Sequence, residues 1–262
     1  MTTPILRNPY VGPRPFTNSP EDIDVFFGRT RETRQIFSLV VAEPAILVFG
    51  QSGTGKTSLL RAGLQPMLED NRFEVWGPVR VQGYADNPVI RNIFIYNALR
   101  GWVGEGAASD LAQMSLTDFL HSRPRSADSE RDLPLRILIF DQFEELFTAY
   151  GAERWTDREK FFRQITQALK EDEYLRVMFF MREDFIGELV PYETLLPGRL
   201  EARFRLERLR RDPAFEAVTG PVEKTPRRYV GGAAELLVDK LIRVENVVPP
   251  VGTEEFVEPV IL

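Results

Sequence analysis

A short glycine-rich segment limits what this chain can fold into more than any other feature. Residues 50–57 read Gly-Gln-Ser-Gly-Thr-Gly-Lys-Thr, which fits the pattern G-x-x-x-x-G-K-[ST], and they follow the apolar run 45–49. The glycines let the backbone turn where side chains would clash, so successive N–H groups can converge on phosphate oxygens. Such a loop needs a strand before it and a helix after it, and the apolar run and the helical spacing of residues 58–64 predict both. The segment therefore predicts a binding site for a nucleoside triphosphate.

Each residue of this loop has an expected role. Lys56 adds a positive charge for the β- and γ-phosphates, and Thr57 offers a hydroxyl to Mg²⁺. The other residues expected to contact the nucleotide are Gly50, Gln51, Ser52, Gly53, Thr54, Gly55 and Ser58. The alternative is a glycine-rich surface turn that matches the pattern by chance, and the flanking strand and helix disfavour it.

Composition narrows the chemistry that the chain can perform. It contains 262 residues, no cysteine and one histidine, His121. These counts exclude disulfides, thiolate nucleophiles, zinc–thiolate sites and a histidine cluster for a transition metal. We therefore expect any metal to be a hard cation with oxygen ligands that arrives with the phosphates. Since the sequence shows neither an apolar run of about 18 residues nor a secretion signal at residues 1–4, we expect a cytoplasmic protein.

The net charge of −6 argues against a general nucleic-acid binder, because contact with phosphate backbones needs a basic face. The segment 199–211 is an exception, because it is rich in arginine. Its arginines stand at positions 199, 203, 205, 208, 210 and 211, with acidic residues between them. A solvated face or intramolecular pairing is the favoured interpretation. Contact with a protein or a nucleotide phosphate, and contact with nucleic acid, are the alternatives.

Alternating strand and helix patterns predict an α/β fold. After the run at 45–49, further strands are predicted at 76–82, 135–140 and 175–181. Helices are predicted at 30–41, 58–64, 88–102, 116–121 and 157–171. We therefore expect a three-layer sandwich of the P-loop NTPase type with a mostly parallel sheet, and a site at the carboxyl edge of its strands.

The expected domain organisation has three parts. Residues 1–20 are rich in proline and should form an extended N-terminal arm, and residues 21–210 should form the α/β domain. Residues 211–262 should form a small helical subdomain. Because the sequence stops on Val-Ile-Leu without a polar cap, we expect this subdomain to be truncated from a longer protein.

The helical subdomain has a simple predicted pattern. One helix is expected at 213–218, and Thr219-Gly220-Pro221 should end it. A second amphipathic helix is expected at 233–245.

Hydrolysis requires further groups, and the first of them follows a predicted strand. The strand at 135–140 places Asp141 at its end, where a carboxylate can hold the Mg²⁺ shell beside Thr57. Asp141 is therefore a candidate metal ligand and catalytic residue.

Two glutamates follow Asp141 closely. Glu144 and Glu145 are near enough in the chain for one of them to orient an attacking water. Many ATPases of this class carry the catalytic glutamate directly after the aspartate, where this chain has Gln142, so the choice between Glu144 and Glu145 stays open. The alternative for each glutamate is a structural role: it would lie in the first turn of the following helix and stabilise that helix by interacting with the helix dipole.

Arg182 ends the next predicted strand. In a parallel sheet this strand end lies beside Asp141, so Arg182 could contact the γ-phosphate. The alternative is an ion pair at the strand end with Glu183 or Asp184.

Several motifs follow one another along the chain. They are Asn8–Phe16, Phe26–Arg29, the glycine-rich loop with Ser58–Leu64, Asp141–Phe147, Arg182–Phe185 and Thr219–Lys224. In this order they resemble the bacterial STAND ATPases, the signal-transduction ATPases with numerous domains, and among these the group called novel STAND. The resemblance covers nearly the whole chain.

The resemblance implies a regulated switch. ADP would hold a closed monomer, and ATP together with a signal at a C-terminal sensor would open it. The opened protein would form homo-oligomers that recruit or activate an effector, in bacterial defence or in regulatory signalling. The implied cofactors are ATP or ADP with Mg²⁺, and the implied partners are the C-terminal sensor region or a separate effector protein, not a membrane or a nucleic acid.

The resemblance also implies residue roles. Phe27, Gly28 and Arg29 match a segment that forms the adenine-side wall of the nucleotide site. Arg182 matches a γ-phosphate sensor. Pro221 matches the proline of a Gly-x-Pro element that contacts the base, although this chain has Gly220 and Pro221 in direct succession.

The favoured function is a slow ATPase whose output is conformational. A nucleotide-dependent scaffold or partner-binding module without significant hydrolysis is the second hypothesis, and Gln142 argues for it. An AAA-type loader that acts on nucleic acid is the third, and the acidic balance counts against it. The choice between ATP and GTP is left open by the sequence.

Overall fold

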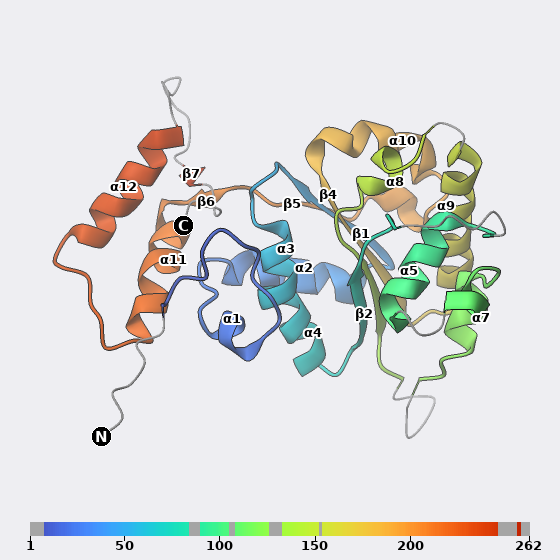
Figure 1. The fold of residues 1–262 in the computed structure, drawn as a ribbon, viewed down its shortest axis with the longest axis horizontal. Helices are drawn as coiled ribbons and strands as arrows, with labels where there is room; N and C mark the ends of the chain where they lie inside the picture. Colours follow the sequence, from blue (N-terminus) through green and yellow to red (C-terminus); the bar gives the residue numbers. More distant parts are fainter. Residues whose placement is uncertain are drawn as a thin grey trace. The chain divides into compact units, whose positions relative to one another are not determined.

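A parallel sheet organises the larger part of the chain (Figure 1). The computed structural model describes residues 8–83, 90–104, 108–125, 133–151, 154–245 and 256–257. The chain forms two compact units. The larger unit consists of residues 36–50 and 68–205, and the smaller unit consists of residues 1–35, 51–67 and 206–262.

The sheet of the larger unit has five strands within the described residues. They are β1 (Ala45–Gly50), β2 (Glu74–Val79), β3 (Arg136–Phe140), β4 (Leu175–Arg182) and β5 (Arg203–Arg205). Their order is β2-β3-β4-β1-β5, and every pairing between neighbours is parallel. The carboxyl ends of the strands therefore meet at one edge of the sheet. The predicted α/β fold with a mostly parallel sheet is confirmed.

Apolar side chains form the central strands. Every residue of β3 is buried, and β1 is buried at every position except Phe49. Strands of parallel sheets read as continuous apolar runs because both of their faces are covered, which is why β1, β3 and β4 were predictable. The register pairs Ala45 with Val177 and Gly50 with Arg182, so β1 and β4 end together.

The observed β2 lies earlier in the sequence than predicted. It was expected at 76–82 and spans Glu74–Val79. Pro78 has no N–H to donate to a neighbouring strand, and the register against β3 shifts between Trp76 and Val79. The pairing ends there, so the three residues after Val79 lie outside the strand.

The short strand β5 was not predicted. It contains Arg203 and Arg205, which belong to the arginine-rich segment 199–211. A strand of three residues that include two arginines has neither an apolar run nor an alternation of apolar and polar residues long enough to predict it.

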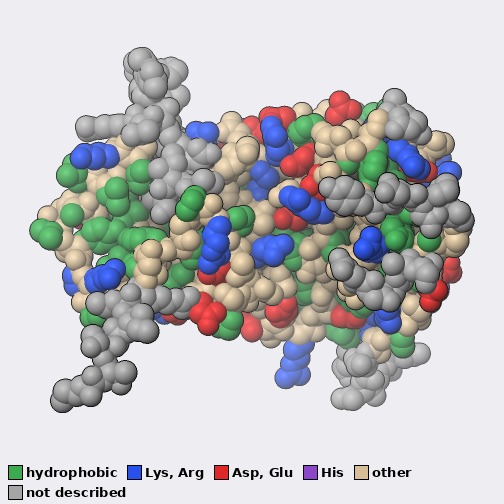
Figure 2. All heavy atoms as spheres, in the orientation of Figure 1, with side chains coloured by type: hydrophobic (Ala, Val, Ile, Leu, Met, Phe, Trp, Pro, Cys, Tyr) green, Lys and Arg blue, Asp and Glu red, His purple; other side chains and the backbone are tan. Residues whose placement is uncertain are grey.

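Most arginines of the segment 199–211 form ion pairs within the molecule. The pairs join Arg203 to Glu193 (2.7 Å), Arg205 to Glu183 (3.1 Å), Arg210 to Glu207 (3.7 Å) and Arg211 to Asp239 (2.9 Å). On the face drawn in Figure 2, basic and acidic side chains are interspersed rather than gathered in separate patches. These observations favour intramolecular pairing over a basic patch for a polyanion.

Helices that follow the strands pack against the sheet of the larger unit (Figure 1). The longer ones are α5 (Ile93–Val103), α7 (Leu116–His121), α9 (Trp155–Glu171) and α10 (Ile186–Glu193), and the shorter ones are α6 (Ala108–Leu111), α8 (Glu145–Thr148), and the 3₁₀ turns Glu183–Phe185 and Pro197–Leu200. Helix α7 has its predicted bounds. Helix α5 begins at Ile93 because the Asn92 side chain caps it, while the predicted start at 88 lies outside the described residues.

Aromatic rings fill the core between these helices and the sheet. Phe143 lies at the centre of this cluster, with its ring centroid 4.5 Å from that of Phe179. Other fully buried members of the cluster are Phe94, Phe119, Phe140, Phe161 and Phe162. Edge-to-face and offset contacts of this kind add to the hydrophobic burial.

The smaller unit contains the helix that follows the glycine-rich loop and a pair of C-terminal helices. Its elements are α1 (Pro20–Asp24), α3 (Lys56–Ser58), a π-helical segment (Leu59–Leu64), α11 (Arg211–Glu223), α12 (Ala233–Glu245) and the antiparallel pair β6 (Leu209–Arg210) and β7 (Phe256–Val257). The boundary between the two units falls within α2 (Thr30–Ala42) and α4 (Gln65–Asp70). Within the described ranges, no helix combines the length and apolar character that crossing a membrane requires.

The predicted break at Thr219-Gly220-Pro221 is wrong. Helix α11 continues through these residues to Glu223, and Gly220 and Pro221 are buried. A Cβ atom on Gly220 would lie 2.5 Å from the Phe27 ring. The glycine is therefore needed for close packing inside a helix rather than for a turn, and this packing outweighs the low helix propensity of the segment. Helix α12 has its predicted bounds.

A buried carboxylate organises residues 14–22 of the smaller unit. Asp22 is 2% exposed and accepts hydrogen bonds from both Arg14 Nη atoms (2.7 and 2.8 Å) and from the backbone and hydroxyl of Thr17 (2.7 and 2.8 Å). The hydrogen bonds from Arg14, followed by those from Thr17, hold the pKa of Asp22 well below its ordinary value although burial raises it.

Replacing Asp22 with Asn should destabilise the protein at neutral pH. The amide cannot accept these hydrogen bonds as a charged group, so we expect the free energy of unfolding to fall by about 2 kcal/mol. A lowered pKa in the folded state means that this stability is present above the unfolded value of about 3.9 and is lost as the pH falls. Urea denaturation should show a difference between Asp22→Asn and wild type at pH 7 that shrinks below about pH 4. An equal difference at pH 7 and pH 3 would contradict this account.

Candidate nucleotide-binding site

The candidate site residues fall into two sets, one in each compact unit. The glycine-rich loop after Gly50, the segment Phe27–Arg29 and Pro221 belong to the smaller unit. Gly50, Asp141, both glutamates and Arg182 belong to the larger unit.

The loop lies between β1 and α3, as its sequence pattern requires. Gly50 is the last residue of β1, and Lys56 is the first residue of α3. Gly53 (φ 81°) and Gly55 (φ 85°) have left-handed backbone conformations, which side chains with a Cβ rarely adopt. The Lys56 ammonium donates to the Gln51 carbonyl (2.7 Å), and the buried Thr54 hydroxyl donates to the same carbonyl (3.0 Å).

Arg29 braces this loop. Its side chain is only 4% exposed and donates to the Thr54 carbonyl (3.0 Å), the Glu207 carbonyl (2.8 Å) and the Glu32 carboxylate (2.7 Å). Burial lowers the pKa of the Arg29 guanidinium, and the Glu32 carboxylate opposes this change. A single buried cation therefore joins the start of α2, the loop and the segment before β6.

The residues on either side of the Arg29 brace also pack closely. Gly28 has a φ of 84°, and a Cβ atom there would lie 2.3 Å from the Pro213 carbonyl oxygen. Phe27 packs against Gly220, the residue before Pro221. The structure thus brings Phe27 and Gly28 against α11, the helix that contains Pro221.

The neighbouring segment of the N-terminal arm reaches the helix after the loop. The Phe16 backbone N–H donates to the Ser58 hydroxyl (3.2 Å). Ser58 was expected to contact the nucleotide, and here its hydroxyl is an acceptor for the arm.

The second set lies at the carboxyl edge of the sheet. Arg182 ends β4 opposite Gly50, and Asp141 follows β3 directly. Asp141 is 6% exposed, and its Oδ1 accepts the Gln142 backbone N–H (2.9 Å). The strand order thus brings Gly50, Arg182 and Asp141 to neighbouring strand ends, which the sequence predicted for Arg182 and Asp141.

Glu144 and Glu145 have different surroundings. The Oε2 atom of Glu144 accepts the Arg182 backbone N–H (3.1 Å), and the side chain is half-buried. Glu145 is 8% exposed, and its Oε1 lies 3.4 Å from Arg80 Nε. Burial raises the pKa of Glu145, while the Arg80 charge and a hydrogen bond from the Gln82 backbone oppose that change.

The Arg182 side chain contacts its own chain neighbours. Its guanidinium forms an ion pair with Asp184 (2.5 Å) and lies over the Phe185 ring, 5.5 Å from the centroid. Both carboxylate and guanidinium are about half exposed, so the pair contributes little to stability. This is the ion pair that the sequence offered as the alternative to phosphate contact.

The partners of Arg29 and Glu145 were not predicted. Glu32 stands three residues after Arg29, and Arg80 directly follows β2. Glu32 lies in the first turn of the helix predicted at 30–41, three residues after Arg29, and this spacing is a usable signal for the first pair. The second pair depends on where β2 ends, which the sequence did not place correctly.

Each unit offers oxygen donors of the kind that a hard cation prefers. In the larger unit the donor is Asp141, a buried carboxylate at the sheet edge, and in the smaller unit it is the Thr57 hydroxyl. Within the described residues, no group of three or more histidine, aspartate or glutamate side chains could hold a metal by itself.

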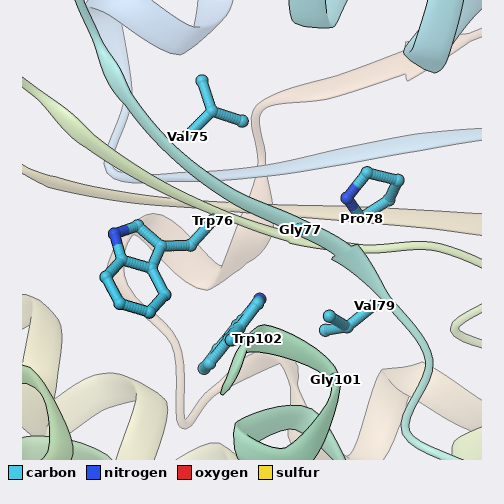
Figure 3. A pocket seen from close by; sticks show the side chains of 7 residues that line it. All are labelled: Val75, Trp76, Gly77, Pro78, Val79, Gly101 and Trp102. Carbon is cyan, nitrogen blue, oxygen red and sulfur yellow. The ribbon is translucent and has the colours of Figure 1, made fainter. Parts of the chain in front are cut away.

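A cavity in the larger unit lies between β2 and the end of α5 (Figure 3). Its volume is ≈ 280 Å³, and its lining comes from β2 and the end of α5. The Trp76 and Trp102 rings meet edge to face at 6.2 Å. The other lining residues are Val75, Gly77, Pro78, Val79 and Gly101. This lining carries no charged side chain, so it offers nothing to neutralise a triphosphate.

The fold and the loop together define a P-loop nucleotide-binding protein. A parallel sheet with this strand order, and a loop of left-handed glycines between β1 and α3, are its structural features. The sequence narrows this class, because residues 9–251 match the family model described as Novel STAND NTPase 1. The chain belongs to this family of NTPases, which confirms the resemblance to STAND proteins.

Two solved structures share the fold. The Walker-type ATPase PABY2304 of Pyrococcus abyssi is 17% identical, with a TM-score of 0.58, and the match covers 87% of this chain and 66% of that chain. The ORC1 protein of Aeropyrum pernix, solved in complex with DNA, is 16% identical, with a TM-score of 0.54 and coverage of 91% and 61%. At these identities the likeness concerns the fold alone, and this chain spans less than two thirds of either protein. No curated protein matches the chain.

Replacing Arg29 with Lys should destabilise the smaller unit. A lysine carries its three N–H donors on one nitrogen, so it cannot span the acceptors that two separate guanidinium nitrogens of Arg29 bind, and a carbonyl at Thr54 or Glu207 loses its partner. We expect the free energy of unfolding to fall by about 2 kcal/mol. Arg31→Lys is the matched control, because Arg31 is exposed, and it should change stability by less than about 0.5 kcal/mol. Equal urea midpoints for Arg29→Lys and Arg31→Lys would refute the bracing role.

Proposed function

We propose that this chain is the nucleotide-binding core of an ATP-driven signalling switch that hydrolyses ATP slowly. The observation that carries this proposal is the glycine-rich loop, in which Gly53 and Gly55 have left-handed backbones. The loop starts at the end of β1, and Arg182 and Asp141 lie at the ends of the next two strands of the sheet. Family membership supports nucleotide binding and hydrolysis. The proposed output is a change of conformation and oligomeric state controlled by ATP and ADP.

The loop residues would bind and orient the phosphates. Backbone N–H groups of residues 51–57 are the proposed donors, and the left-handed glycines allow them to converge. Lys56 would exchange its bond with the Gln51 carbonyl for phosphate oxygens. Arg29 would keep the loop in shape by holding the Thr54 carbonyl.

Thr57 and Asp141 are the residues that would hold Mg²⁺. When bound, the cation neutralises phosphate charge during phosphoryl transfer. Arg182 would contribute a second positive charge once its guanidinium leaves Asp184. Phe27 and Pro221 remain proposed base contacts. A cytoplasmic location is part of this proposal, as is a partner in the form of a sensor region or an effector protein.

Gln142 is the observation that favours a second function. It stands where related ATPases carry the catalytic glutamate, and its backbone is left-handed (φ 52°). A chain without a working base would bind nucleotide and act as a scaffold. Turnover measured beside affinity separates the two functions.

Replacing Lys56 with Ala should abolish ATP hydrolysis and weaken nucleotide binding. The variant loses the charge that faces the β- and γ-phosphates, so we expect turnover to fall by about 100-fold or more. Phosphate release and binding of a fluorescent ATP analogue are the measurements. Lys160→Ala is the control, since Lys160 is an exposed residue of α9.

The same proteins test the proposed switch. For the wild type, light scattering should give a larger molecular mass with a non-hydrolysable ATP analogue than with ADP. For Lys56→Ala, the molecular mass should be the same with either nucleotide. Wild-type turnover and affinity in Lys56→Ala would defeat the nucleotide-binding proposal. One unchanged mass for the wild type in both nucleotides would defeat the oligomeric switch.

A further inference from the structure

We propose that Glu144 is the residue that activates the attacking water, and that Glu145 is a positioning residue for the segment after β2. This assignment rests on the proposed ATP hydrolysis. It resolves a choice that the sequence left open, because the two glutamates are adjacent in the chain but have partners at the ends of different strands, β4 for Glu144 and β2 for Glu145.

The left-handed backbone at Gln142 directs the chain from β3 toward the end of β4. Phe143, the next residue, is fully buried, and its backbone N–H donates to the Phe180 carbonyl of β4 (2.8 Å). The chain therefore passes alongside β4 after leaving β3. This path brings Glu144 to Arg182, whose backbone N–H donates to the Glu144 carboxylate (3.1 Å).

Glu144 is thereby fixed next to the strand that leads into the glycine-rich loop. Arg182 is paired in register with Gly50, the first residue of the loop. Neighbouring strands lie about 4.8 Å apart, so the anchor of Glu144 is one strand spacing from the start of the loop. A base must come within hydrogen-bond reach of the water that attacks the γ-phosphate, directly or through one further water.

The partners of Glu145 lie at the end of β2, which is the edge strand on the far side of β3 from β4. Its carboxylate contacts Arg80 and the Gln82 backbone, which follow β2. β3 and β4 separate β2 from β1, so this side chain is anchored about 14 Å from the strand that carries the loop. The side chain is also almost completely buried, whereas Glu144 is half-buried and can be reached by water.

The proposed step is balanced without a further reactant. The water oxygen forms a bond to the γ-phosphorus, and the bond from that phosphorus to the β–γ bridging oxygen breaks, leaving its electron pair on ADP. Glu144 accepts the proton of the attacking water and then releases it to solvent. Arg182 takes part twice, since its backbone fixes the base and its side chain is the proposed phosphate contact.

The test compares Glu144→Gln with Glu145→Gln in the full chain. A glutamine at 144 can still accept the Arg182 backbone N–H through its amide oxygen, so the variant loses the base while keeping the anchor. We expect Glu144→Gln to lower kcat by about 100-fold or more, with the Kd for the ATP analogue within about threefold of wild type. Glu145→Gln should keep at least about a third of the wild-type kcat. Glu188→Gln is the control, because Glu188 is an exposed residue of α10.

A second variant and the binding data keep the outcomes distinct. Glu144→Asp keeps the charge but shortens the side chain, and we expect a loss of about tenfold. Wild-type kcat in Glu144→Gln, or a 100-fold loss in Glu145→Gln with Kd unchanged, would overturn the assignment. Wild-type protein that binds ATP without hydrolysing it would also overturn the assignment while leaving the binding site intact. Failure of the wild type to bind ATP would instead show that the proposed function is wrong.

Discussion

The parallel pairing of β1 with β4 is the interaction on which the rest of this structure depends. It runs from Ala45 opposite Val177 to Gly50 opposite Arg182, and the two strands end together. The loop that follows Gly50 therefore starts beside the backbone N–H that anchors Glu144. Since β3 pairs with the other side of β4, Asp141 reaches the same edge. A shift of register in this pairing would move Gly50 away from Arg182.

Buried glycine contacts and one buried arginine give the smaller unit its local order. Gly28 and Gly220 allow the backbone of the Phe27–Arg29 segment to lie directly against α11. Arg29 then connects this segment to the glycine-rich loop through the Thr54 carbonyl. The loop and α11 therefore share a common support within this unit.

The sequence predicted the features that depend on local pattern. β1, β3 and β4 are apolar runs, and α12 follows a helical spacing, so their positions required no knowledge of the rest of the fold. β5 is too short and too rich in arginine to give such a signal. The continuation of α11 through Pro221 could not be predicted, because it depends on the contact between Gly220 and Phe27, which are far apart in the chain.

In the candidate site, too, the sequence predicted residue types and spacing but not the contacts that depend on the folded chain. Residue types and spacing were sufficient to name Lys56, Asp141, Glu144 and Glu145. They could not separate the roles of the two glutamates, because that depends on the left-handed backbone at Gln142, a conformation that is uncommon for residues other than glycine. The ion pair between Arg182 and Asp184 was foreseen only as an alternative to phosphate contact.

The measurement that tests the central claim most directly is the Mg²⁺ dependence of ATP hydrolysis in the wild type and in Asp141→Asn. Asp141 is buried at the end of β3, and its neutral amide analogue should still fit there. We predict that wild-type turnover requires Mg²⁺ and that Asp141→Asn loses about 100-fold or more of it while still binding the nucleotide. Turnover that is independent of Mg²⁺, or equal in the two proteins, would contradict the account.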